Sequence, residues 1–102
     1  KRIVKKIRQA GAKEVHFFVS SPPVKFPDFY GIDTPRQKDL IGAKMSVEKI
    51  RQFIGADSLH YLSYEGMIKA TGLSEKLLST SCFSGIYPVD IGDRVKEVSF
   101  AI

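Results

Sequence analysis

Cysteine occurs once in the 102 residues of this chain, and tryptophan and asparagine do not occur at all. A single cysteine excludes an internal disulfide, which fits a chain kept in a reducing compartment. The sequence also lacks any apolar run near the roughly 18 residues that a membrane helix needs, and its basic start lacks the apolar core of a signal peptide. We therefore expect a cytoplasmic chain with no membrane partner.

Acidic residues are missing from the first thirteen positions, which hold six of the sixteen basic residues. The rest of the chain carries ten basic and eleven acidic side chains, so the net charge of +5 comes from one short segment. A solvated helix face is the favoured interpretation, because nucleic-acid surfaces usually spread their cations with polar and aromatic partners over a wider patch. The alternative function is a small basic module that binds phosphates of a nucleotide or of nucleic acid. The pattern disfavours nucleic acid as a partner.

The first nineteen residues have the pattern of a helix followed by a strand. Residues 2–10 carry their apolar side chains on one helical stripe, and Gly11 can end the helix because glycine adopts the left-handed conformation at low cost. Residues 14–19 are apolar on both faces, which is typical of a strand buried inside a parallel sheet. The segment therefore predicts the second half of a βαβ unit.

Residues 20–35 form a proline-rich stretch that holds four of the five prolines. A long loop of this kind inside a compact domain is usually functional or a linker. Phe26, Phe29 and Tyr30 make it too apolar for a linker. We expect an extended loop that packs against the rest of the chain.

The remaining elements are predicted from caps, spacing and glycines. Thr34 and Gln37 have the spacing of a capping box, with Pro35 at the first helical position, and predict a helix over residues 35–43. The other expected elements are a helix over 47–54 capped by Ser46, a strand over 59–62, a helix from 63 or 64 to 71, a turn over 74–78, a loop over 82–85 and a strand over 94–102.

The predicted strands are too few and too short to make an independently stable parallel sheet. A strand buried on both faces needs neighbours at its edges. We therefore expect an α/β fold that is the back half of a domain, with the front half missing or supplied by another chain. Unpaired strand edges of this kind should make the isolated chain self-associate.

Five short blocks carry a resemblance to a known family. They are Gly11–Val15 (GAKEV), Ser20–Pro23 (SSPP), Tyr30–Pro35 (YGIDTP), Ile54–Leu59 (IGADSL) and Cys82–Pro88 (CFSGIYP). In this order they resemble the C-terminal part of glutamine phosphoribosylpyrophosphate amidotransferases, also called amidophosphoribosyltransferases. The resemblance implies part of a type I phosphoribosyltransferase fold, which is a doubly wound parallel sheet, and the first committed step of purine synthesis, in which ammonia from glutamine replaces the pyrophosphate of phosphoribosyl pyrophosphate.

The resemblance covers residues 1–88 and leaves 89–102 as a tail of unassigned role, within one C-terminal portion of a phosphoribosyltransferase domain. It places the nucleophilic cysteine of the glutaminase domain and the two diphosphate-binding aspartates upstream of Lys1. It implies Mg²⁺ for the full enzyme. We therefore expect no catalytic residue in this chain, no activity of the chain alone, and the remainder of the amidotransferase as its partner.

Some members of the family carry a structural iron–sulfur cluster. Three of its ligand positions fall on Asp28, Ser79 and Cys82, so two of the three are not cysteine. Because such a cluster needs four thiolates, we expect no cluster here and no other metal site. Cys82 is then interpreted as a packed cysteine, and His16 and His60 as sheet histidines rather than as bases or metal ligands.

The resemblance also suggests lining residues for the path of ammonia. Tyr30 and Ile32 would wall its phosphoribosyl end, and Leu40 matches a family position on the path. Leu40 can equally be part of the buried face of helix 35–43. Asp33 would orient a substrate group, although such an aspartate more often closes a turn or interacts with a helix N-terminus.

Overall fold

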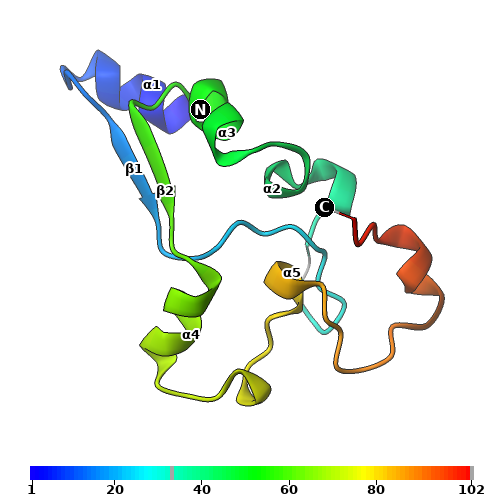
Figure 1. The fold of residues 1–102 in the computed structure, drawn as a ribbon. Helices are drawn as coiled ribbons and strands as arrows, with labels where there is room; N and C mark the ends of the chain where they lie inside the picture. Colours follow the sequence, from blue (N-terminus) through cyan, green and yellow to red (C-terminus); the bar gives the residue numbers. More distant parts are fainter. Residues whose placement is uncertain (33, 102) are drawn as a thin grey trace.

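A computed structural model describes residues 1–32 and 34–101. Its helices and strands are α1 (Arg2–Gln9), β1 (His16–Val19), α2 (Ile41–Lys44), α3 (Val47–Ile54), β2 (Ser58–Tyr61), α4 (Tyr64–Thr71) and α5 (Ser81–Ser84), with 3₁₀ turns η1 (Gln37–Asp39), η2 (Glu75–Leu77) and η3 (Gly92–Glu97). Figure 1 shows two parts, which we call the sheet region (residues 1–19 and 46–78) and the loop–tail region (residues 20–32, 34–45 and 79–101).

The sheet consists of β1 and β2, which pair in parallel with His16 opposite Ser58 and Val19 opposite Tyr61. The ladder continues beyond both ends, because the Asp57 amide donates to the Val15 carbonyl at 2.8 Å and the Leu62 amide to the Val19 carbonyl at 3.0 Å. The predicted strands over 14–19 and 59–62 are confirmed, although β1 starts two residues later than predicted and β2 lies one residue earlier.

One face of this sheet is covered and the other is bare. Helix α3 packs on β2, with Ile50 and Leu59 both buried. On the opposite face Phe18 is 73% exposed and stacks on His60 at a centroid distance of 4.9 Å. The expectation that strand 14–19 is buried on both faces is therefore wrong for this chain. A two-stranded sheet with helices on one side leaves every second side chain in solvent.

Local signals fix the helices of the sheet region. The Ser46 hydroxyl accepts the Lys49 amide at the start of α3, and the Ser63 hydroxyl accepts the Gly66 amide at the start of α4. Helix α4 ends at Gly72, whose φ of 68° lies in the left-handed region that glycine tolerates. These two helices and the turn η2 confirm the predictions for residues 46–78.

The predicted helix over 35–43 is wrong. Leu40 has extended backbone angles (φ −82°, ψ 116°) and separates η1 from α2. The Thr34 hydroxyl accepts the Asp28 amide at 2.7 Å instead of capping a helix. The Gln37 side chain likewise bonds to Lys25 and Ser99 rather than to the backbone of its own turn. Hydrogen bonds to distant segments have replaced the capping box.

Two further predictions near the C-terminus are wrong. Residues 82–85 belong mostly to the single turn α5, which begins at the buried Ser81 and ends at Gly85. Residues 94–101, the described part of the predicted strand, do not form one, because η3 extends to Glu97 and the residues after it are irregular. The Asp90 carboxylate accepts the Gly92 amide at 2.8 Å and starts the turn that leads into η3. Ile102 lies outside the described residues.

The chain exposes more surface than a compact domain of its size. Its accessible surface is 7380 Å², whereas a compact monomer of this mass exposes about 5,800 Å². Its radius of gyration is 15.8 Å, against about 13 Å for a compact chain of this length. The buried apolar residues include Val4, Val15, Phe26, Ile50, Ala56, Leu59 and Val98. Within the described part of the chain, no helix is long and apolar enough to span a membrane.

Candidate functional site: a cavity between the proline-rich loop and the tail

A cavity of about 770 Å³ lies in the loop–tail region. One wall is the end of the proline-rich loop with η1, and the other is the tail after Arg94. The lining residues are 27–29, 32, 34–38, 43, 44, 94 and 96–99. The cavity therefore exists only because segments about 60 residues apart in sequence lie side by side.

The cavity combines apolar side chains with cations. Phe29 and Ile32 line it, and the Arg94 guanidinium lies over the Phe29 ring at 5.5 Å from the centroid. The other cations in the lining are Arg36, Lys38, Lys44 and Lys96, and the carboxylates are Asp28 and Glu97. Arg36 pairs with Asp39 at 3.2 Å and Lys96 with Asp93 at 3.5 Å, so part of the positive charge is balanced locally.

Hydrogen bonds join the proline-rich loop and η1 to residues 87–99. The Tyr87 hydroxyl donates to the Pro27 carbonyl at 2.7 Å. The Tyr30 hydroxyl donates to the Val89 carbonyl at 2.6 Å and accepts the Val89 amide at 3.2 Å. Gln37 binds both backbone groups of Ser99, and this pair joins the two walls of the cavity. Each contact joins a side chain of one segment to a backbone group of the other.

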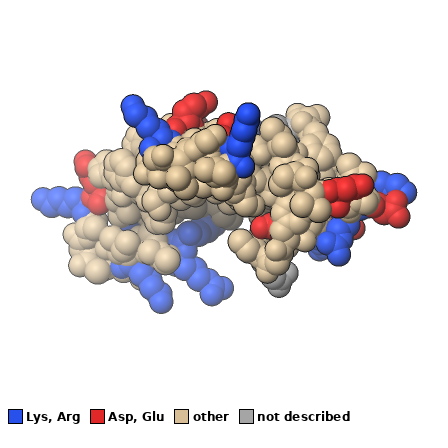
Figure 2. All heavy atoms as spheres, turned by 90° about the horizontal axis from the view of Figure 1, so that it is seen from below, with Lys and Arg blue, Asp and Glu red and all other residues tan. Residues whose placement is uncertain are grey.

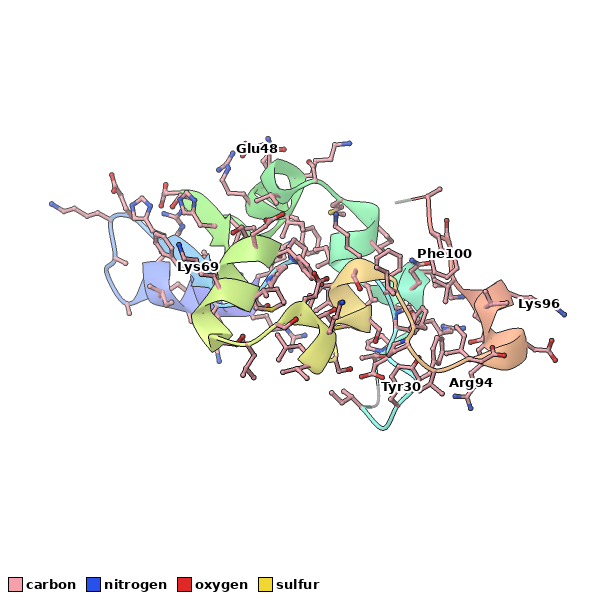
Figure 3. The ribbon with its side chains drawn as sticks, turned by 60° about the horizontal axis from the view of Figure 1, so that its bottom comes forward. Tyr30, Glu48, Lys69, Arg94, Lys96 and Phe100 are labelled. Atoms are coloured by element: carbon pink, nitrogen blue, oxygen red, sulfur yellow. The ribbon has the colours of Figure 1, made fainter. Side chains whose placement is uncertain are left out.

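Aromatic side chains fill the space between these hydrogen bonds. The contacts are Phe26–Phe100, Phe29–Tyr87, Tyr30–Tyr87 and Tyr87–Phe100, with ring centroids 5.5 to 6.3 Å apart. Figure 3 shows Tyr30, Arg94 and Phe100 gathered at one end of the molecule, far from Lys69. Burial, with smaller contributions from Tyr30 and Asp28, raises the pKa of Tyr87 to about 12. Tyr87 therefore stays neutral and keeps its donor proton at physiological pH.

The structure brings some of the predicted lining residues together and separates others. Ile32 lines the cavity and is 67% exposed. Tyr30 lies beside the cavity rather than in its lining, with its hydroxyl bound to Val89. Leu40 is half-buried in the extended link between η1 and α2 and does not line the cavity. Asp33 lies outside the described residues. The roles proposed for these four residues stay predictions.

Gln37 is the residue of this site that sequence reasoning missed. Its position three residues after a threonine made it look like part of a helix cap. Its true partners are 12 and 62 residues away, and a single sequence carries no local signal for contacts of that kind.

The three former cluster positions do not offer the donors that an iron–sulfur cluster needs. Cys82 is half-buried, and burial, followed by the nearby Asp28 carboxylate, raises the pKa of its thiol. The Asp28 carboxylate accepts the Tyr30 amide at 2.6 Å. A serine stands at position 79. One thiol of raised pKa, one occupied carboxylate and one hydroxyl do not fit a site built from four thiolates.

The two histidines lie on the sheet, away from the cavity. His16 is exposed and hydrogen-bonds with Ser58 at 2.7 Å and Glu14 at 2.9 Å, and His60 stacks on Phe18. Among the described residues, no three His, Cys, Asp or Glu side chains are grouped so that they could hold a metal ion.

The basic segment at the start of the chain forms no broad cationic patch. Arg8 binds the Asp57 carboxylate at 2.8 Å and the Gly55 carbonyl at 2.7 Å, and Lys1 lies over the Phe53 ring. On the face seen in Figure 2, Lys and Arg side chains lie mostly around the periphery, and Asp and Glu lie near some of them. This distribution does not favour the phosphate-binding alternative.

Comparison with known proteins shows which class of fold the chain resembles. No family model matches the sequence. The structure superposes with a TM-score of 0.82 on the glutamine phosphoribosylpyrophosphate amidotransferase of B. subtilis in its complex with ADP and GMP, with 49% identity over 90% of this chain and 21% of that one. The fold is therefore part of a type I phosphoribosyltransferase domain.

The relatives found by comparing sequences carry the name of one enzyme within that class. Amidophosphoribosyltransferase of Synechococcus elongatus is 50% identical over 95% of this chain, and that of Bacillus subtilis is 50% identical over 89% of it. The chain spans about one fifth of the length of these relatives, each of which it covers to 20%. The chain is a homologue of the C-terminal part of amidophosphoribosyltransferases, as the five sequence blocks predicted.

Proposed function

We propose that this chain works as the C-terminal part of an amidophosphoribosyltransferase, where it supplies the back half of the phosphoribosyltransferase domain. The observation that carries the proposal is the superposition on the B. subtilis enzyme, at 49% identity and a TM-score of 0.82. The excess surface of the chain and the bare sheet face around Phe18 support it, because both are what a segment shows without the structure that normally covers it.

In the reaction that the resemblance implies, glutamine is hydrolysed in another domain, and the ammonia attacks the ribose carbon of phosphoribosyl pyrophosphate and releases pyrophosphate. We assign no nucleophile, base or metal ligand for these steps among the residues that the structure describes; the Mg²⁺ of the reaction would be held elsewhere in the enzyme. Its contribution is part of the wall of the route that ammonia takes. Tyr30, Ile32 and Leu40 line the route of neutral ammonia, and an apolar lining gives ammonia no proton donor. Asp33 either orients a substrate group or closes the turn.

The test compares the native polypeptide that contains this sequence with the isolated residues 1–102. We expect the native polypeptide to be several times heavier than 11.4 kDa, by intact mass after capture with an antibody to this chain. We expect it to make phosphoribosylamine from phosphoribosyl pyrophosphate and glutamine, and residues 1–102 to make none. A native mass near 11.4 kDa, or no product from the native polypeptide, would contradict the proposal.

We further propose that the protein holds no iron–sulfur cluster, supported by the donor set at Asp28, Ser79 and Cys82. The native polypeptide should contain neither iron nor acid-labile sulfide after anaerobic purification. Stoichiometric iron and sulfide, with the visible absorption of a cluster, would overturn this proposal.

We also propose that the remainder of the amidotransferase is the partner of this chain. When residues 1–102 are isolated from that partner, they cover their unpaired strand edges by self-association. Light scattering at micromolar concentration should show oligomers, and a clean monomer would count against this. The enzyme is cytoplasmic, which cell fractionation with the same antibody tests.

A further inference from the structure

Gln37 connects three separate segments through one side chain. Its amide nitrogen donates to the carbonyl oxygens of Lys25 at 3.0 Å and Ser99 at 2.9 Å, and its amide oxygen accepts the Ser99 amide at 2.7 Å. Both amide hydrogens and the amide oxygen are therefore used. The pair of bonds to Ser99 has the form of a backbone ladder, with the side-chain amide in place of a second strand.

A second anchor of the same form lies across the cavity. The Tyr30 hydroxyl binds both the carbonyl and the amide of Val89. The two anchors hold the tail at residues ten positions apart, and the loop segment between Tyr30 and Gln37 carries Ile32 and Pro35 of the cavity wall. Because both anchors bind backbone groups of the tail, they fix its position without depending on its side chains.

Phe26 closes the inner end of this arrangement. It is buried, stacks on Phe100 and lies against Gly85. Its amide and that of Lys25 both donate to the Cys82 carbonyl, at 3.1 and 3.0 Å. The loop is therefore held at its start by α5 and along its length by residues 85–99, which run beside it.

We propose that residues 85–99 form a strap that sets the position of the ammonia-lining loop, and that Gln37 is a positioning residue for transfer of ammonia from glutamine. This inference rests on the proposed function. When the Gln37 anchor is lost, the wall segment carrying Ile32 and Pro35 moves away from Ser99, and more water reaches the proposed route of ammonia. Ammonia released from glutamine then escapes, whereas ammonia supplied at high concentration from solution still reaches the ribose without using the route.

The experiment uses the native polypeptide with Gln37→Ala and, as a matched control, Gln52→Ala, because Gln52 is exposed on α3 and its side-chain amide donates to Glu48, one turn away on the same helix. Phosphoribosylamine formation is measured with glutamine and, separately, with ammonium salts. We expect the ratio of glutamine-dependent to ammonia-dependent rate to fall about tenfold in Gln37→Ala, since a misplacement of about 1 Å can cost up to about a hundredfold in rate. The ratio should be unchanged in Gln52→Ala.

Gln37→Glu tests the hydrogen bonds that Gln37 donates separately from the one that it accepts. It keeps the oxygen that accepts the Ser99 amide but turns the donor into a second oxygen facing the carbonyls of Lys25 and Ser99. We expect its ratio to fall at least as far as that of Gln37→Ala. A Gln37→Glu variant with the normal ratio would show that the donor to Lys25 and Ser99 has no positioning role, and would overturn the proposal.

A merely structural role for Gln37 would lower both rates together and leave the ratio unchanged, which also overturns the inference. If the native polypeptide makes no phosphoribosylamine from either source, the proposed function fails instead. The strap is then tested by hydrogen exchange, where Gln37→Ala should speed exchange over residues 26–31 and 86–90 and Gln52→Ala should not. Equal exchange in the two variants would exclude the strap itself.

Discussion

The sheet region and the loop–tail region are held together by different kinds of contact. In the sheet region, helices α3 and α4 each start at a serine whose hydroxyl accepts an amide three residues away, Ser46 for α3 and Ser63 for α4. In the loop–tail region, the deciding bonds join residues 59 to 62 positions apart, as in Tyr30–Val89 and Gln37–Ser99. The first region is specified locally and the second by its tertiary contacts.

The two regions also differ in what they leave open. The sheet region ends in two free strand edges and a bare face with Phe18. The loop–tail region instead forms an open cavity that its own segments line. A segment cut from a larger sheet would lose neighbours in the first region and keep the internal contacts of the second, which agrees with the one-fifth coverage of the relatives.

The strongest test of this comparison is Phe26→Ala. Phe26 is 5% exposed and joins the loop to both α5 and the tail. We expect a loss of about 3–5 kcal/mol in the free energy of unfolding, as for other buried phenylalanines. Phe100→Ala is the control, since Phe100 is 51% exposed and should cost clearly less. Thermal unfolding of the native polypeptide measures both, and equal losses would contradict the central place of Phe26.

The contrast between the regions explains what the sequence alone could predict. Helices α3 and α4 follow from a serine cap, an apolar stripe and a terminal glycine, all within ten residues. Thr34 and Gln37 show the same local pattern, yet their side chains are used by Asp28, Lys25 and Ser99. A local pattern predicts structure only where no distant partner competes for the same polar groups.

In the candidate site, too, the residues that depend on distant partners are the ones that local sequence patterns could not predict. Ile32 lines the cavity, but its predicted role on the path of ammonia came from the family resemblance and stays a prediction. The tail from Arg94 to Ser99 forms the opposite wall, although a strand over 94–102 was expected from the sequence. Gln37 could not be found at all, since its role depends on Ser99 lying beside it.

A matched pair of glycines sharpens the comparison at a smaller scale. Gly72 and Gly85 both end helices with left-handed backbone, at φ 68° and 72°. Alanine at either position costs about 1–2 kcal/mol in backbone strain. At Gly72 an added Cβ meets open space, whereas at Gly85 it would lie 2.8 to 3.0 Å from the Phe26 ring.

We therefore expect Gly85→Ala to cost about 1–3 kcal/mol more than Gly72→Ala, because the buried ring has to shift. Thermal unfolding of the two variants of the native polypeptide gives the difference. Equal costs would mean that Phe26 moves freely and that the inner end of the loop is not fixed.

Two hydroxyl groups test whether the regions respond locally or at a distance. Ser46→Ala should cost about 1 kcal/mol and speed hydrogen exchange at the Lys49 amide, the group that Ser46 caps. Thr34→Ala should cost about as much, as one lost hydrogen bond to a half-buried amide. Its effect should appear at the Asp28 amide, six residues back, and not in η1. Faster exchange in η1 with no change at Asp28 would restore the capping box and contradict the structure.

The smallest effect concerns Asp57, which ties the strand ends of the sheet region to α1. Its carboxylate accepts the Val15 amide at 2.7 Å and pairs with Arg8 at 2.8 Å. The Val15 amide first, and then Arg8, lower the pKa of Asp57 below its ordinary value. A carboxylate whose pKa is lower in the folded state stabilises the fold at pH values above its unfolded pKa, near 4, and this contribution is lost as the pH falls through the folded pKa.

Asp57→Asn removes that titration. We expect the native polypeptide with Asp57→Asn to be slightly less stable than wild type at pH 7, and the difference to shrink as the pH falls towards 3. Asp93→Asn is the control, because the Asp93–Lys96 pair is almost fully exposed at 3.5 Å and should contribute little at any pH. Urea unfolding at pH 7, 5 and 3 measures the difference. A difference that stays constant with pH would show that Asp57 stabilises the sheet region through its shape and not its charge.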